Sequence, residues 1–261
     1  MSEPGPLELA LRAARADGRK LLVPYVTGGV ADDWTSVVSA MAAAGADAIE
    51  IGIPFSDPVM DGPTIQEAST RSLGRGTTPD SIVSALAHLD VTVPLIAMTY
   101  YNLVFRAGHR RFADRLAQGR MCAAIVPDLP LEESGEWESD AAAAGVETVL
   151  LAAPVTPDDR LVRIAARSRG FVYAVGLMGV TGERSSLASS ASVLAARLKA
   201  VTDMPVVIGF GISTPAQARE ACEAADGVVV ASALMRRYLD GASPEAIGDQ
   251  VAAFRTGLDA G

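Results

Sequence analysis

Two carboxylates near the end of one strand-like segment have the types and spacing to move protons. Isoleucine occupies every second position from 49 to 53, which places Glu50 on the opposite face of that strand. A buried carboxyl without a cationic partner has a raised pKa, which suits a group that gives and takes protons near neutral pH. Asp61 lies eleven positions later, behind a proline-stiffened loop that could return it to the same site. Two carboxyls in different environments can divide acid and base roles. The alternatives are a solvated or arginine-paired Glu50 and an ordinary Asp-Gly turn.

Three loops rich in small residues follow later strand-like segments. They are Gly179–Gly182, Gly209–Ser213 and the pair Ala231-Ser232. Each alone is more typical of a tight turn. Together they predict a phosphate site, because backbone N–H groups and a helix N-terminus beginning at Ser232 can hold an anion without cationic side chains. The stretch Gly176–Ser192, rich in Gly and Ser, is predicted to be a mobile lid.

The scarcity of lysine and histidine restricts the chemistry. The lysines are Lys20 and Lys199, and the histidines are His88 and His109. All four fall outside the predicted strand ends, so we expect no Schiff base, no metal site and no cofactor. If such a site breaks a C–C bond, the substrate itself must accept the electrons.

Short β-branched runs alternate with alanine-rich helical segments and would position these residues. The predicted strands are Leu21–Val26, Asp47–Gly52, Val93–Met98, Met121–Val126, Glu147–Leu151, Gly170–Val175, Pro205–Gly209 and Gly227–Val230. The predicted helices are Leu7–Ala16, Asp33–Ala44, Pro79–Leu89, His109–Gln118, Glu132–Ala144, Pro157–Arg167, Ala188–Val201, Pro215–Glu223 and Pro244–Leu258. Threonines before Pro79, Pro157 and Pro215 are expected to cap helices, and Gly45 and Gly145 to end them.

This alternation favours a parallel sheet with helical crossovers. The predicted fold class is α/β, a (β/α)8 TIM barrel formed by one domain over residues 1–261, with an extra N-terminal helix on its floor. An open doubly wound sheet is the competing architecture, but no GxGxxG follows the first strand. In a barrel, active sites lie at the carboxyl ends of the strands, where Glu50 and the glycine loops fall.

The composition limits the partners and the compartment. The chain is 49% hydrophobic with a net charge of −9 and no basic run, so neither nucleic acid nor a membrane surface is an expected partner. Cys122 and Cys222 suggest no disulfide framework, and the N-terminal stretch lacks the features of a signal peptide. We therefore expect a cytoplasmic protein.

The segment Glu50–Gln66, EIGIPFSDPVMDGPTIQ, resembles the signature of the tryptophan synthase alpha subunit family. Further matches follow along nearly the full length, namely Tyr101–Phe105, Pro127–Glu133, Gly179–Gly182 and Gly209–Ser213. The resemblance implies retro-aldol cleavage of indole-3-glycerol phosphate to indole and glyceraldehyde 3-phosphate, a carbon–carbon lyase reaction of tryptophan biosynthesis.

The resemblance also implies roles for single residues. Glu50 would be the general acid/base, and Asp61 would hydrogen-bond the indole N–H. Tyr173 would lie close to Glu50, Phe210 and Tyr25 would hold the indole, and Thr181 would contact Asp61 when the lid closes. The implied phosphate-binding residues are Gly182, Gly211 and Ser232.

The implied partner is a pyridoxal-phosphate-dependent beta subunit in an alpha2beta2 assembly. The surface of this chain on which the beta subunit docks would include the Pro54–Met60 loop and a turn at Tyr101–Asn102. A free-standing indole-3-glycerol phosphate lyase is an alternative function. A phosphosugar isomerase on the same barrel is a second alternative, although this sequence lacks the His or Lys electrophile that such chemistry usually needs. A catalytically silent partner of a beta subunit is a third.

Overall fold

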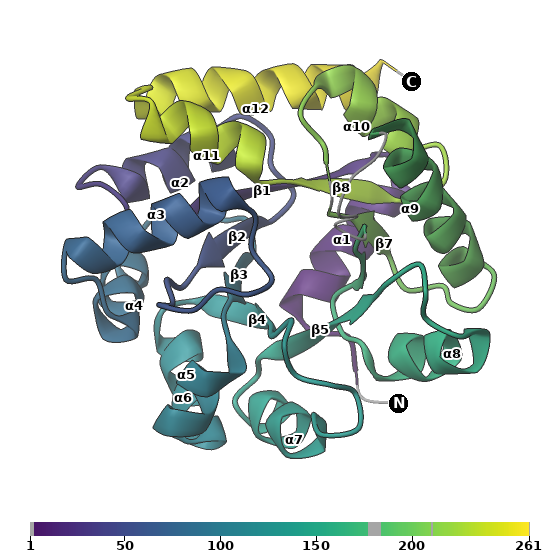
Figure 1. Cartoon of the computed structure of the whole chain (residues 1–261), viewed down its shortest axis with the longest axis horizontal. Helices are drawn as coiled ribbons and strands as arrows, with labels where there is room; N and C mark the ends of the chain where they lie inside the picture. The colour runs from purple at the N-terminus through teal and green to yellow at the C-terminus, as the bar shows by residue number, and fades with distance from the viewer. Residues whose placement is uncertain (1–2, 177–183, 210, 261) are drawn as a thin grey trace.

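Eight parallel strands form a closed barrel in the order β1 to β8 (Figure 1). This computed structural model describes residues 3–176, 184–209 and 211–260. The strands are β1 (Leu21–Thr27), β2 (Ile49–Gly52), β3 (Leu95–Met98), β4 (Met121–Ile125), β5 (Glu147–Ala152), β6 (Val172–Ala174), β7 (Val206–Ile208) and β8 (Gly227–Val230). The barrel closes because β8 pairs with β1, Gly227 lying opposite Leu21. The end at which the strands' carboxyl termini lie is the barrel mouth.

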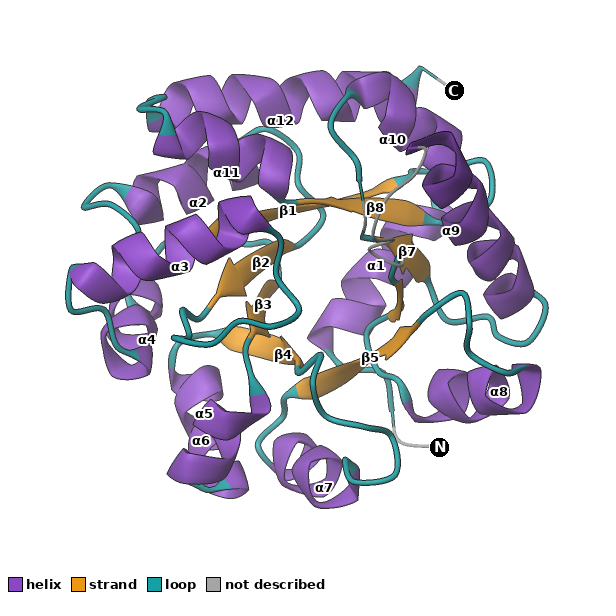
Figure 2. Ribbon diagram, viewed as in Figure 1, coloured by secondary structure: helices purple, strands orange, loops and turns teal. Residues whose placement is uncertain are grey.

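Helices surround the barrel and cross its floor (Figure 2). They are α1 (Pro6–Ala16), α2 (Trp34–Ala43), α3 (Pro63–Gly74), α4 (Pro79–Ala87), α5 (Tyr101–Ala107), α6 (His109–Gln118), α7 (Gly135–Ala143), α8 (Asp158–Arg167), α9 (Arg184–Lys199), α10 (Pro215–Ala221), α11 (Ser232–Leu239) and α12 (Pro244–Asp259). The predicted barrel with a leading helix is confirmed. Within the described residues, no helix is long and apolar enough to cross a membrane.

The side chains of each strand alternate between two cores. One core fills the barrel and includes Leu21, Ala48, Ile96 and Phe171; the other lies between strands and helices and includes all three isoleucines from 49 to 53. Glu50 therefore points into the barrel, as the alternation predicts.

Helix α1 closes the barrel floor. Leu7 and Leu11 are fully buried and join the interior core. The carboxylate of Glu147, at the start of β5, accepts the amides of Leu7 at 2.7 Å and Glu8 at 3.0 Å. These two bonds satisfy donors that the first helical turn leaves without partners, and they attach α1 to the start of β5. Because α1 covers this end of the barrel, a substrate can enter only at the mouth.

The capping predictions hold at four of five helix ends. Thr78 and Thr214 accept the amides of Ser81 and Gln217 in capping boxes. Gly45 and Gly145 follow α2 and α7 with φ of +95° and +74°, the left-handed conformation that glycine adopts readily. The prediction for Thr156 is wrong, because α8 begins at Asp158 with Pro157 as its N-cap. The Thr156 hydroxyl instead accepts the amide of Ala153 at 3.0 Å.

Two further predictions are wrong at helix starts. Tyr101–Asn102 is not a turn but the first residues of α5, whose first amide donates to Asp128 Oδ1 at 2.8 Å. Helix α9 begins at Arg184, four residues before the start predicted at Ala188, so the last part of the predicted lid is helical. Leu and Ala among the serines of this stretch support a helix. Residues 177–183 of the predicted lid lie outside the described part of the chain.

Candidate active site

Glu50 is the buried carboxyl of the barrel interior. Its side chain is 2% exposed and lies between Tyr25 of β1 and Ile96 of β3 in the register of the sheet. Within the described residues, its Oε2 atom has no hydrogen-bond partner. Burial, with a smaller contribution from the charge of Asp61, raises the pKa of Glu50 to about 8. Glu50 is therefore protonated at neutral pH and able to donate a proton.

Asp61 is half-buried in the loop between β2 and α3, and its charge acts on Glu50. The loop is held by two hydrogen bonds of Asp61 backbone atoms, from its amide to Pro58 O at 3.1 Å and from Gln66 Nε2 to its carbonyl at 2.8 Å. Burial raises the pKa of Asp61 to about 6, against a hydrogen bond from Tyr100 that lowers it. Between about pH 6 and about pH 8, Asp61 is thus mostly ionised while Glu50 is mostly protonated.

Tyr25 and Tyr173 lie in the mouth beside Glu50, and two glycines make room for their phenols. A Cβ on Gly52 would meet the Tyr25 hydroxyl at 1.9 Å, and a Cβ on Gly209 would meet that of Tyr173 at 2.1 Å. Both phenols have raised pKa values because they are buried, with contributions from the charges of Glu50 and Asp61. The tyrosines are therefore neutral hydroxyls at every pH relevant to the carboxyls.

Tyr100 is a residue of this site that the sequence reasoning missed. It is 4% exposed and directly follows Thr99, whose amide continues the ladder of β3 by donating to Ile125 O at 3.0 Å. Its hydroxyl accepts the amide of Met60 at 3.0 Å and hydrogen-bonds Asp61. The sequence did contain one signal for it. Tyr100 lies four positions after the interior residue Ile96, so the alternation of side chains along a strand places it on the same inward face.

The candidate phosphate residues lie at neighbouring strand ends. Gly211 follows β7 with a φ of +71°, and Ser232 is the first residue of α11 after β8, which pairs with β7. An α-helix leaves its first amides without acceptors inside the helix, and α11 begins at the mouth end of β8. Gly182, Thr181 and Phe210 lie outside the described residues.

Nearly the whole chain matches one family. A family model described as tryptophan synthase alpha chain matches residues 11–257. The alpha chain of Gloeobacter violaceus is 42% identical over an alignment 259 residues long, which covers 97% of this chain and 94% of that relative. The alpha chain of Thermobifida fusca is also 42% identical, over 98% of this chain and 97% of the relative. The chain belongs to the tryptophan synthase alpha chain family.

Solved structures of tryptophan synthases share this fold. The alpha subunit from Legionella pneumophila superimposes with a TM-score of 0.88 at 28% identity, over 99% of this chain and all of that one (100%). A tryptophan synthase chain from Mycobacterium tuberculosis gives 0.87 at 36% identity, over 98% and 99%. The predicted family and its lyase function are confirmed, and these similarities favour a tryptophan synthase alpha chain over a phosphosugar isomerase.

The two lysines and two histidines of this alpha chain contact groups other than Glu50. Lys20 donates to the carbonyl of Cys222, and Lys199 pairs with Asp226. His88 contacts Ser84 O, and His109 contacts the Tyr101 hydroxyl. Among the described residues, no three His, Cys, Asp or Glu side chains group as they would around a metal ion. Proton transfer in the mouth therefore depends on the carboxyls and the phenols.

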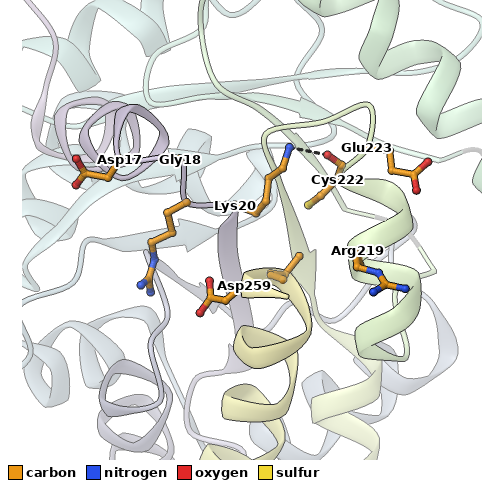
Figure 3. A pocket seen from close by; sticks show the side chains of 9 residues that line it. Asp17, Gly18, Lys20, Arg219, Cys222, Glu223 and Asp259 are labelled. Atoms are coloured by element: carbon orange, nitrogen blue, oxygen red, sulfur yellow. Dashed lines mark hydrogen bonds between the residues drawn. The ribbon is translucent and has the colours of Figure 1, made fainter. Parts of the chain in front are cut away.

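Two cavities of the alpha chain differ in position and lining. One of about 310 Å³ opens at the mouth between the ends of β4, β5 and β6 and is lined by mostly apolar side chains, among them Met60, Val126, Leu151 and Val175. The larger, of about 880 Å³, lies at the opposite end, around Lys20 before β1 (Figure 3). Its acids and bases are mixed, and the Lys20 ammonium is held by the Cys222 carbonyl at 2.7 Å. The first lies at the mouth, the end at which barrel enzymes bind substrates, and its lining includes Met60 next to Asp61 but neither Glu50 nor Asp61.

Proposed function

We propose that Glu50 and Asp61 carry out the retro-aldol cleavage of indole-3-glycerol phosphate in this alpha chain. The observation that supports the proposal is a buried carboxyl inside the barrel, with a pKa raised to about 8 and no hydrogen-bond partner for its Oε2 among the described residues, followed in the next loop by a carboxyl with a pKa of about 6. Glu50 donates its proton to C3 of the indole ring and takes the proton of the adjacent side-chain hydroxyl. The bond between C3 and the side chain then breaks, its electron pair returns to the ring, and the hydroxyl carbon leaves as the aldehyde.

Asp61 complements the positive charge that forms on the ring. Protonation at C3 makes the indole a cation, and an ionised carboxylate that accepts its N–H stabilises that cation more than the neutral ground state. The protonated ring is the electron sink, so the reaction needs neither a Schiff base nor a metal ion. Glu50 ends each cycle protonated, as it began, because the proton of the hydroxyl replaces the one given to C3.

The other predicted residues hold the substrate. We assign the indole to Tyr25, Tyr173 and Phe210 with the apolar cavity beside Met60, and the phosphate to Gly211, Ser232 and Gly182. Thr181 contacts Asp61 in the closed state. Support from the described residues comes from the buried phenols of Tyr25 and Tyr173 and from the adjacent ends of β7 and β8.

A tryptophan synthase beta subunit is the proposed partner, in an alpha2beta2 assembly. Apolar side chains are exposed where that partner would dock: Val59 is 79% and Met60 52% exposed in the loop 54–60, and Phe105 is 67% exposed on α5. Exposed apolar groups gathered on one rim suit a protein interface. The cytoplasm is the proposed compartment, which is consistent with the free thiols of Cys122 and Cys222.

The test is the release of indole from indole-3-glycerol phosphate, measured with and without the beta subunit. We expect slow release by the isolated chain and strong activation by the beta subunit. High activity without activation would identify a free-standing lyase. No release under either condition would refute the proposed reaction.

A further inference from the structure

Tyr100 is fixed in the barrel mouth by three separate contacts. Its ring stacks on that of Phe55, with centroids 5.2 Å apart and planes inclined by 25°. Its hydroxyl receives the amide of Met60 at 3.0 Å and hydrogen-bonds Asp61. The segment from Phe55 to Asp61 is thereby attached at both ends to one side chain that is 4% exposed.

The direction of these hydrogen bonds follows from the donors available. A backbone amide can only donate, so the Tyr100 oxygen must be the acceptor of the bond from Met60. A phenol has one proton, and that proton remains for the carboxylate of Asp61. A hydrogen bond donated to a carboxylate favours its ionised form.

The titratable groups on which the Asp61 charge acts supply no cation. Glu50 approaches from β2, Tyr25 from β1 and Tyr173 from β6, and all three are uncharged in the pH range in which Asp61 is ionised and Glu50 is protonated. Burial raises the pKa of Asp61. Within the described residues, the Tyr100 hydroxyl is the group whose interaction lowers the pKa of Asp61.

We propose that Tyr100 is a positioning residue that keeps the Asp61 carboxylate ionised and aimed into the mouth. The inference rests on the proposed function, because it assigns Tyr100 to the state of Asp61 that stabilises the indole cation. Tyr100 does not transfer a proton to the substrate. It acts through Asp61, and Phe55 and the Met60 amide keep its own hydroxyl in place.

The test compares Tyr100→Phe with the wild-type chain and with Tyr238→Phe. Tyr100→Phe keeps the ring that stacks on Phe55 and removes only the hydroxyl. Tyr238 is a matched control, because it too is a buried tyrosine whose hydroxyl donates to an aspartate, Asp33 Oδ1 at 2.5 Å. The first readout is the pKa of Asp61 by carboxyl ¹³C NMR, with the resonance assigned from Asp61→Asn. The second is the pH profile of indole release.

In Tyr100→Phe we expect the pKa of Asp61 to rise and the ascending limb of kcat/KM to move to higher pH. At neutral pH kcat should fall at least about tenfold, because a hydrogen bond to a charged group is lost, while KM changes little. Tyr238→Phe should leave both profiles unchanged. An unchanged Asp61 pKa in Tyr100→Phe, or a fall in thermal stability with no movement of the limb, would overturn the proposal. The NMR titration is independent of catalysis, so a wild-type chain that releases no indole contradicts the proposed function alone.

Discussion

Glu50 and Asp61 illustrate how one barrel mouth gives two carboxyls different protonation states. Glu50 is enclosed by the interior side chains of its own and neighbouring strands, and its Oε2 has no hydrogen-bond donor among the described residues, whereas Asp61 lies in a loop and accepts from Tyr100. Their pKa values are about 8 and about 6. The interval between them is the range in which the acid and the anion coexist.

We expect kcat/KM for indole release to follow a bell-shaped pH profile with limbs near these two values. The rate rises as pH increases through about 6 because Asp61 ionises, and it falls through about 8 because Glu50 loses the proton it must donate. Initial rates at constant ionic strength measure both limbs. Asp61→Asn should abolish the ascending limb. A rate that continues to rise above pH 8 would contradict these roles.

The raised pKa of Glu50 also affects stability. Its folded pKa of about 8 exceeds the unfolded value of about 4.5, so the folded state loses stability relative to the unfolded state as pH rises between these values. The Tm of Glu50→Gln minus that of wild type should therefore grow by several degrees between pH 5 and pH 8.5, at roughly 2–4 °C per kcal/mol. Calorimetry at both pH values measures this. Glu132→Gln, which alters a surface carboxylate paired with Arg160, serves as the control and should show no such growth.

At the scale of elements, strand ends and glycines position the aromatic groups. The end of β2 accommodates Tyr25 and the end of β7 accommodates Tyr173, each where a neighbouring glycine has no side chain. Backbone conformation does not require these glycines, since neither has a positive φ. The close approach of a phenol requires them.

We expect Gly209→Ala to lower kcat/KM at least about tenfold while the chain remains folded. Its Cβ would meet the Tyr173 hydroxyl at 2.1 Å, so the phenol must move from its place near Glu50, and small displacements in an active site are costly. Gly135→Ala, at a position with nothing within 4 Å of the new Cβ, is the matched control. Steady-state kinetics and far-ultraviolet circular dichroism of both variants test this. Equal activities would show that Tyr173 need not stay where it is.

Much of this framework could be predicted from the sequence, and the gaps have physical causes. Period-two alternation identified the strands and the inward face of Glu50, and the chain enters α4 and α10 at the predicted threonine caps. Helix α3 escaped prediction because its sequence, PTIQEASTRSLG, has few apolar residues to mark a buried face. Strand alternation could have placed Tyr100 on the inward face, but not its role, because its contacts with Phe55 and the Met60 amide depend on the conformation of the loop.

At the scale of the whole molecule, the proposed docking surface and the active site share one loop. Residues 54–60 expose Val59 and Met60 outward, while the Met60 amide is bound to Tyr100 and Asp61 follows directly. A beta subunit on this surface would therefore contact the segment that positions Asp61. The closure of β8 on β1 supports the proposal that residues 1–261 form one domain.

We expect Val59→Asp to weaken binding of the beta subunit at least about tenfold, because it places a charge where an interface would bury an exposed apolar side chain. Isothermal titration calorimetry with the purified beta subunit measures the change. Val193→Asp on α9, where the valine is 60% exposed outside the proposed surface, should bind as the wild type does. Equal losses in both variants would place the interface elsewhere.

The most direct test of the proposed mechanism is indole release by Glu50→Gln in the presence of the beta subunit. Glutamine keeps the size of the side chain but can neither donate the proton to C3 nor accept that of the hydroxyl. We expect kcat to fall at least about 100-fold, the usual scale for loss of a general acid/base, with binding of indole-3-glycerol phosphate largely retained. Retention of most of the wild-type kcat would contradict the assignment of Glu50.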